Sequence, residues 1–254
     1  MSKPLTKLVT RTVTSPRRSQ KHKTAQVPSR RQTPAPDVAQ EFFCGQKYLG
    51  EPRVLLLDIE TSTNLAHVWG KWEQDVIEFE RHWYMLCFSY KWMHEKKTHV
   101  VALPDFKGYK KHPEDDKALL KKLHALLCAA DVVVGHNFSR FDQRKINARF
   151  LVHKLPPPTP FAIVDTLKIA RRLFAFDSNK LDDLGQQLGL GRKTKTHGKA
   201  TWLGAMRGDM KEWRNMISYS RQDTILENEL LMRLLPWVPQ RSNRQKPVVS
   251  KHHA

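Results

Sequence analysis

The sequence has few cysteines and no long apolar run. Its three cysteines, Cys44, Cys87 and Cys128, lie far apart in a chain of 254 residues and form no C-x-x-C pair. This spacing supports neither a disulfide framework nor a zinc knuckle and is typical of a reducing intracellular setting. No apolar stretch approaches the roughly 20 residues that a membrane-spanning helix needs. We therefore expect a soluble protein without membrane contact.

Several catalytic motifs are also missing. The sequence contains no G-x-x-x-x-G-K-[ST] loop for nucleoside triphosphates, and Gly189-Leu-Gly191 lacks the third glycine of a dinucleotide site. It has no serine nucleophile elbow. His94 and His99 are separated by five positions instead of the four of a zinc-protease helix. These absences exclude four common classes of enzyme site.

Acidic residues are scarce relative to basic ones. The chain has 44 Lys and Arg against 25 Asp and Glu, a formal net charge of +19, which points to a polyanionic partner such as nucleic acid. Much of the excess lies at the two ends: residues 1–50 hold ten cations and two acids, and residues 237–254 hold four cations and no acid.

The composition of these ends predicts basic tails that build no core. Two interpretations of these tails stay open: solvated disorder, and salt-sensitive binding to phosphates. Residues 1–36 are acid-free and rich in Arg, Ser and Thr, so a mitochondrial transit peptide is a third alternative to the cytoplasmic location that we expect.

The middle of the chain, residues 51–236, is expected to form one α/β domain. Buried-strand patterns alternate with helical periodicity after three initial strands. We expect strands at residues 53–58, 84–92, 98–103, 131–134 and 161–165, and helices near residues 119–127, 138–152, 166–176, 181–188 and 211–235. This order predicts a mixed sheet covered by helices.

Acidic and phenolic residues recur at the ends of these elements. Asp58 and Glu60, in Asp58-Ile-Glu-Thr61, are two residues apart, so both side chains can leave the same face of a strand. Asp142 ends the run Gly135-His-Asn-Phe-Ser-Arg-Phe-Asp142, in which a strand feeds a glycine turn and then a helix. Tyr219 and Asp223 stand at i and i+4 on one helical face.

In this order the pieces resemble the three motifs of the DEDD superfamily of 3′-5′ exonucleases, in the branch whose third motif carries tyrosine. The resemblance covers about residues 53–236 and implies a ribonuclease H-like fold with a five-stranded mixed sheet flanked by helices. In its residues, this part of the chain is most similar to stand-alone exonuclease domains of bacteriophages and their proofreading relatives. It thus implies the cytoplasm of a host cell and a separately encoded DNA polymerase as a partner.

The resemblance also implies a role for each residue. Asp58 would bridge two divalent metal ions, Glu60 and Asp223 would serve the ion that activates water, Asp142 would support the second ion, and Tyr219 would orient the attacking water. Four converging carboxylates repel one another unless cations neutralise them. Ligands made only of oxygen favour Mg²⁺ or Mn²⁺ over zinc.

Other residues are candidates for contact with nucleic acid. Asn137 is expected either to touch the substrate or to pin the Gly135 turn, and Phe141 either to wedge beside bases or to join the core, with the core favoured. The cationic segment at residues 191–202 suits either a phosphate-gripping loop or a solvated one. For Asp165 the resemblance implies an acid near the site, whereas its place before a helix favours the role of a helix cap, which we expect. The full set of expected contacts is Thr61, His136, Asn137, Phe141, Lys193, Lys195 and Lys199.

The expected substrate is single-stranded or 3′-frayed DNA. No motif reads a ribose 2′-hydroxyl, so RNA is the close alternative. The alternative from another functional class is a nucleic-acid-binding scaffold that kept the fold and lost catalysis. The complete set of acidic residues argues against it.

Overall fold

A computed structural model of the chain describes residues 51–72 and 75–239. The expected N-terminal tail, residues 1–50, lies outside the described residues, as does the C-terminal tail from residue 240 onward. Within the described ranges no helix combines the length and the apolar character needed to cross a membrane.

The centre of the fold is a five-stranded mixed sheet. Its strands are β1 (Val54–Thr61), β4 (Met85–Trp92), β5 (His99–Ala102), β6 (Val132–Gly135) and β7 (Ala162–Asp165), in the order β5-β4-β1-β6-β7. β4 is antiparallel to both β1 and β5, whereas β6 is parallel to β1 and β7. This arrangement confirms the predicted ribonuclease H-like architecture.

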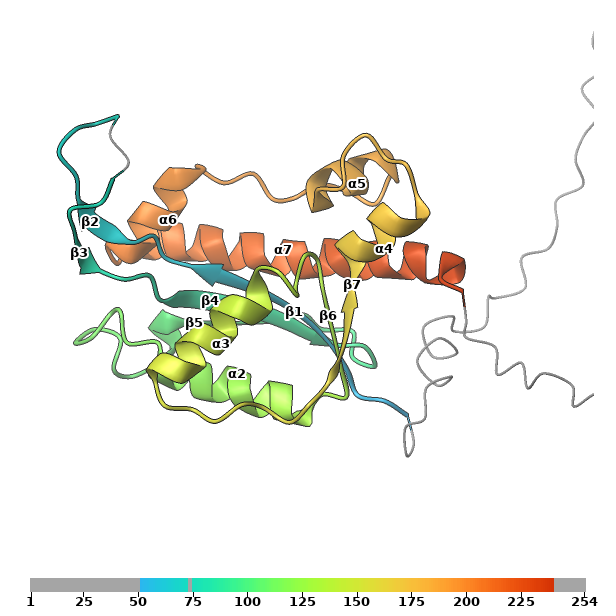
Figure 1. Ribbon diagram of the computed structural model, residues 1–254, viewed down its shortest axis with the longest axis horizontal. Helices are drawn as coiled ribbons and strands as arrows, with labels where there is room; N and C mark the ends of the chain where they lie inside the picture. Colours follow the sequence, from blue (N-terminus) through green and yellow to red (C-terminus); the bar gives the residue numbers. More distant parts are fainter. Residues whose placement is uncertain (1–50, 73–74, 240–254) are drawn as a thin grey trace, which may run out of the picture. The chain divides into compact units, whose positions relative to one another are not determined.

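Helices cover both faces of this sheet. They are α2 (Lys117–Ala129), α3 (Asp142–Val152), α4 (Thr166–Leu173), α5 (Leu181–Gln187), α6 (Lys199–Met206) and α7 (Met210–Leu234). Figure 1 shows α7 running along one face and α2 and α3 lying against the other. Contacts of α4, α5 and α6 with α7 complete the α7 layer.

The alternation of side chains along β1 separates the two layers. Leu55, Leu57 and Ile59 are buried in one cluster with the leucines of α2. Val54 and Leu56 are buried in another cluster with Leu231 of α7, because successive side chains of a strand point to opposite faces. The even-numbered residues of β1 therefore face α7.

The structure differs from the sequence expectations in three places. A second sheet of two short strands, β2 (Leu65–His67) and β3 (Glu78–Arg81), follows β1. Helix α6 was not expected. Helix α3 begins at Asp142, four residues later than predicted, because Asn137 has a φ of 66° and the chain turns before the helix can start.

Candidate active site

Two of the acidic residues are brought together by β1. Asp58 and Glu60 have the same parity as Leu56, so both face α7. Asp58, Glu60 and Asp223 of α7 each offer a carboxylate oxygen, and these oxygens all lie within 4.8 Å of one another. The structure therefore joins the first and third sequence motifs in one site.

Small polar residues fix the position of α7 beside this site. Ser89 is the partner of Asp58 across the β1–β4 pair. Its hydroxyl lies 2.7 Å from the carbonyl oxygen of Ser220 and 2.6 Å from Oγ1 of Thr224, and all three of these residues are buried. Since Thr224 follows Asp223 directly, these hydrogen bonds hold Asp223 in register with Asp58.

Asp142 joins the site from the start of α3. Its side chain is buried, and its Oδ1 accepts a hydrogen bond from the backbone N–H of Ile59 at 3.3 Å. Ile59 lies between Asp58 and Glu60, so this bond ties the second motif to the first.

The loop before Asp142 is held by tight packing and by Asp165. A Cβ atom at Gly135 would lie 2.7 Å from Cβ of Phe138, so only glycine fits there. The carboxylate of Asp165 accepts hydrogen bonds from the backbone N–H groups of Asn137 and Ser139. It also accepts from the N–H of Lys168 and so caps α4 as predicted.

Burial and crowding make these carboxylates costly to ionise. Burial, aided by the charges of Glu60 and Asp142, raises the pKa of Asp58 well above its usual value. Burial and then Asp223 raise the pKa of Glu60 to about 8, and burial raises the pKa of Asp142 to about 7. Ionising all of these carboxylates together therefore requires positive charge from another group.

The same cluster has free coordinating atoms. Among residues 51–72 and 75–239, Oδ2 of Asp58 and Oδ1 of Asp223 are buried without a hydrogen-bond partner. Buried carboxylate oxygens are normally paired with donors or bound to metal. The residues present therefore fit divalent cations held by oxygen ligands.

Lys193 supplies a positive charge to this site. Its Nζ lies 2.5 Å from Oδ2 of Asp223 and 3.1 Å from the phenol oxygen of Tyr219. Burial alone would lower the pKa of Lys193, but Asp223 raises it above its ordinary value. The backbone N–H of Lys193 is anchored on Oδ1 of Asp182 at 2.8 Å. The sequence left Lys193 in either a phosphate-gripping or a solvated loop, whereas the structure places its ammonium against Asp223, a metal-ligand candidate.

Tyr219 stands beside Asp223 on α7. Burial and then the charge of Asp223 raise the pKa of Tyr219 to about 12, so its hydroxyl stays protonated at neutral pH. The ring of Trp202, from α6, meets the Tyr219 ring edge-on at a centroid distance of 5.5 Å. Trp202 was not singled out from the sequence, because its position depends on the unexpected helix α6.

A further buried acid near the site, Glu227, was not predicted from the sequence. Glu227 is 1% exposed, and its Oε1 has no hydrogen-bond partner among the residues that the structure describes. Burial and then Asp142 raise its pKa well above the usual value. Glu227 follows Asp223 at i+4, so the same helical spacing that links Tyr219 to Asp223 could have found it.

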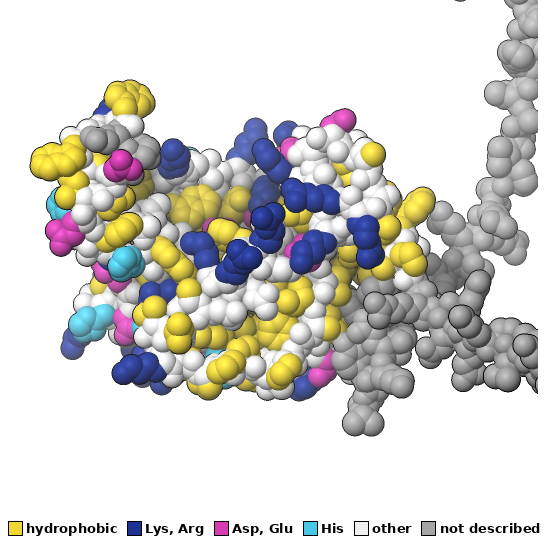
Figure 2. Space-filling view, viewed as in Figure 1, with side chains coloured by type: hydrophobic (Ala, Val, Ile, Leu, Met, Phe, Trp, Pro, Cys, Tyr) yellow, Lys and Arg dark blue, Asp and Glu magenta, His cyan; other side chains and the backbone are white. Residues whose placement is uncertain are grey.

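The other residues that were expected to contact nucleic acid differ in their exposure and in their hydrogen bonds. Phe141 is 44% exposed, so the favoured core interpretation was wrong. The ring nitrogens of His136 lie 2.9 Å from Oγ1 of Thr166 and 2.9 Å from the carbonyl oxygen of Asn179 and are engaged within the protein. Lys195 and Lys199 are exposed. Figure 2 shows Lys and Arg side chains gathered across the middle of the face that carries α3 and the segment joining α5 to α6.

Two other features lie apart from these acids. Asp116, grouped with Asp115 and His153, already binds the guanidinium of Arg149 at 2.6 and 2.8 Å, so this group is a structural ion pair.

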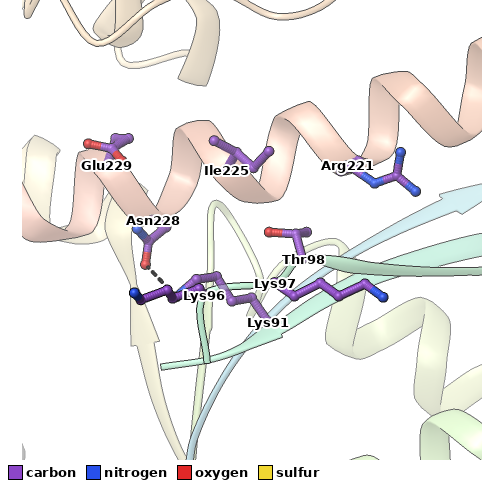
Figure 3. Close-up of a pocket in the computed structure, with 8 residues that line it drawn as sticks. All are labelled: Lys91, Lys96, Lys97, Thr98, Arg221, Ile225, Asn228 and Glu229. Carbon is purple, nitrogen blue, oxygen red and sulfur yellow. Dashed lines mark hydrogen bonds between the residues drawn. The ribbon is translucent and has the colours of Figure 1, made fainter. Parts of the chain in front are cut away.

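A separate cavity of about 470 Å³ lies between α7 and the β4–β5 hairpin, and Figure 3 shows the residues that line it. It is lined by Lys91, Lys96, Lys97, Thr98, Arg221, Ile225, Asn228 and Glu229.

The cavity and the acidic cluster use opposite faces of α7. Arg221 and Ile225 are each two residues from Asp223, which is about 200° around a helix of 3.6 residues per turn. The cavity is therefore distinct from the acidic site.

Comparisons with known proteins agree with this fold. A family model described as RNase_H superfamily matches residues 77–235. The match includes Asp142, Tyr219 and Asp223 and begins after β1. No curated protein matches the sequence.

Among solved structures, the chain is similar to the family B DNA polymerase from the hyperthermophilic archaeon Pyrobaculum calidifontis. The TM-score is 0.55 at 16% identity, over 76% of this chain and 26% of the polymerase chain. The chain thus spans about a quarter of the length of that polymerase, and the likeness concerns the fold.

Proposed function

The chain belongs to the RNase H superfamily, and we propose that it is a metal-dependent 3′-5′ exonuclease that removes nucleotides from single-stranded or 3′-frayed DNA. The main support for this proposal is that carboxylate oxygens of Asp58, Glu60 and Asp223 all lie within 4.8 Å of one another. Asp142 joins them through its bond to the N–H of Ile59. Polarity and the assignment to the tyrosine-bearing branch rest on the order of the three motifs.

The acids have complementary tasks in this proposal. Two Mg²⁺ or Mn²⁺ ions, when bound, would activate a water and stabilise the leaving oxygen during phosphodiester cleavage. Asp58, whose carboxylate is affected by the charges of Glu60, Asp142 and Asp223, would help to hold both ions. Glu60 and Asp223 would help to hold the ion that activates water, and Asp142 would help to hold the other. The unpartnered oxygens of Asp58 and Asp223 supply the free ligand atoms.

Tyr219 and Lys193 would act without changing their own charge. With a pKa of about 12, the Tyr219 phenol orients water as a hydrogen-bonding group and is no general base at neutral pH. Lys193, which contacts both Tyr219 and Asp223, keeps a positive charge next to the place where negative charge develops on the reacting phosphate.

DNA is favoured over RNA because a solved structure of similar fold is that of a DNA polymerase. The same neighbour motivates a separately encoded DNA polymerase as a partner, with proofreading or end trimming as the task. The Lys and Arg side chains on the face that carries α3 and the segment joining α5 to α6 suit a phosphate backbone.

The deciding experiment is digestion of DNA and RNA oligonucleotides labelled at either end, with Mg²⁺ or with EDTA. We expect Mg²⁺-dependent shortening from the 3′ end, faster on single-stranded than on fully paired DNA, and no activity in Asp58→Asn. Faster digestion of RNA would identify an exoribonuclease. Binding of DNA without cleavage under any metal would identify a silent scaffold.

A structure of the Mn²⁺-loaded protein tests the site itself. We expect the four carboxylates of Asp58, Glu60, Asp142 and Asp223 to surround the ions. A carboxylate more than about 8 Å from the other three could not share a two-metal site and would lose its assignment.

A further inference from the structure

Lys145 holds an unusual position at the edge of the acidic site. It lies on α3 one turn after Asp142, and its Nζ is 3.1 Å from Oγ1 of Thr61, the residue that follows Glu60. The same ammonium lies 4.0 Å from the ring centroid of Trp83 and 5.2 Å from that of Phe141. A cation is thus held between two aromatic side chains beside two metal-ligand candidates.

The charge of Lys145 has no counter-ion within the described ranges, where its partners are a hydroxyl and two rings. Burial lowers the pKa of its ammonium, with no carboxylate acting in the opposite direction. An ammonium over an aromatic face gains some attraction from the ring. That attraction leaves its net charge available to an anion.

Trp83 is held by contacts within the protein, and both aromatic partners of Lys145 are at least partly exposed to solvent. The backbone N–H of Trp83 donates to Oδ1 of Asn64 at 2.8 Å, and the guanidinium carbon of Arg149 lies 5.8 Å from the Trp83 ring. Trp83 is partly exposed, and Phe141 is 44% exposed. Aromatic faces next to a cation are the elements with which proteins bind single-stranded nucleic acid.

We infer that Lys145, Trp83 and Phe141 form a binding subsite for one nucleotide next to the cleaved bond. Lys145 binds the phosphate that adjoins the scissile one, because it lies one helical turn away from Asp142. The rings of Trp83, which is partly exposed, and Phe141, which is 44% exposed, stack on a base. This subsite rests on the proposed function, since it takes its ligand from the strand that the acidic site would cut.

The subsite is tested by binding in a full-length Asp58→Asn background, which leaves the strand uncut. The probe is a short 5′-fluorescein-labelled oligothymidylate, followed by fluorescence anisotropy over a range of salt concentrations. Lys145→Met should reduce the slope of log K against log salt by about 0.7, the value for one phosphate contact on a single strand. Lys145→Arg should retain the slope.

Loss of the stacking ring gives a second readout. Trp83→Leu should weaken binding by about 5- to 150-fold, the range for one base stacked on an aromatic side chain, with little change in the salt slope. Oligonucleotide binding should also quench the protein's tryptophan fluorescence less in this variant than in its parent. The matched controls are Lys122→Met on α2 and Trp237→Leu, which should leave both slope and affinity unchanged.

The outcomes separate this inference from the proposed function. If the parent binds the oligonucleotide and the Lys145 and Trp83 variants bind it equally well at every salt concentration, the cluster only stabilises α3 and the subsite is wrong. If the parent itself binds no oligonucleotide, the proposed function fails. Thermal melting of each variant identifies any loss of folding, and Lys145→Arg then decides the charge dependence.

Discussion

The Nζ atom of Lys193 lies 2.5 Å from Oδ2 of Asp223, a residue whose other carboxylate oxygen is buried without a partner in the described part of the chain. Lys193 comes from the segment between α5 and α6, whereas Asp223 comes from α7. The ammonium therefore supplies, in the metal-free protein, part of the positive charge that divalent ions would supply.

This relationship predicts a competition between Lys193 and metal. In Lys193→Met the metal-free protein should melt at a lower temperature, because the buried carboxylates lose their nearest cation. The rise in melting temperature on adding Mn²⁺ should be larger than in the wild type, since the ions no longer displace an ammonium. Differential scanning fluorimetry in EDTA and in Mn²⁺ measures both changes.

Lys195→Met is the matched control, because Lys195 is an exposed lysine on the same segment. It should change neither quantity. An equal response to Mn²⁺ in Lys193→Met and wild type would show that Lys193 does not occupy metal-binding oxygens.

The raised pKa values predict that the metal-free protein loses stability as pH rises. Folding raises the pKa of Glu60 from 4.5 to about 8 and that of Asp142 from 3.8 to about 7. Between these limits the folded state holds protons that the unfolded state releases, so the free energy of unfolding falls as pH increases. We expect a melting temperature in EDTA on the order of 5–10 °C lower at pH 8 than at pH 5.

Saturating Mn²⁺ should remove most of this pH dependence, because bound cations stabilise the ionised carboxylates. Glu60→Gln should also reduce it. A metal-free melting temperature that is flat or rises over the same pH range would contradict the picture of a strained acidic cluster.

The sheet was predictable because its strands carry strong local signals. Residues 54–57 and 132–134 are continuous apolar runs, which few structures other than buried strands accommodate. The β2–β3 ribbon lacked such a signal. The residues of β2 and β3 are exposed or only partly buried, and Trp69 and Trp72, in the segment between the two strands, are 82% and 86% exposed. No burial pattern therefore marks the ribbon in the sequence.

The acidic site was predictable for a different reason. Asp58 and Glu60 share a strand face, and Tyr219 and Asp223 share a helix face, so local periodicity orients each pair. Lys193 and Trp202 meet these residues only through the path of the chain between α5 and α7, which tertiary packing decides. Phe141 was misjudged because α3 starts at Asp142 and leaves Phe141 outside the helical pattern.

Glu227 is predicted to limit stability at high pH. Glu227→Gln keeps the shape of the side chain and removes a buried carboxyl whose pKa is raised by burial. The variant should be more stable than wild type at pH 8 in EDTA and about equal at pH 4, where the native carboxyl is protonated in both folded and unfolded states. Chemical denaturation at the two pH values tests this difference. Equal stability at pH 8 would show that Glu227 ionises freely.

The N-terminal segment provides a prediction outside the described residues. Residues 1–50 carry ten Lys and Arg against two acids. If they bind phosphates, deleting residues 1–49 should weaken oligonucleotide affinity and flatten its salt dependence, while the melting temperature of the remaining domain stays unchanged. An unchanged salt slope would assign the segment to targeting or to solvated disorder.

Tyr219→Phe separates water orientation from proton transfer. The substitution keeps the ring against Trp202 and removes the hydroxyl that contacts Lys193. We expect the single-turnover cleavage rate to fall by about 10² to 10⁴, the scale for one orienting or acid–base group. DNA affinity and Mn²⁺ affinity should stay near those of the wild type, because the hydroxyl is not a metal ligand in this scheme.

The pH profile of Tyr219→Phe makes the test specific. Because the phenol has a pKa of about 12, it does not titrate over roughly pH 6 to 9, so the variant's rate should be lower by the same factor throughout that range. A deficit that changed with pH would indicate proton transfer by the tyrosine. Asp223→Ala, which removes a carboxylate from the cluster, should be at least as damaging and should also weaken Mn²⁺ binding. If Tyr219→Phe kept full activity while Asp223→Ala did not, the acidic site would stand and the role of Tyr219 would be withdrawn.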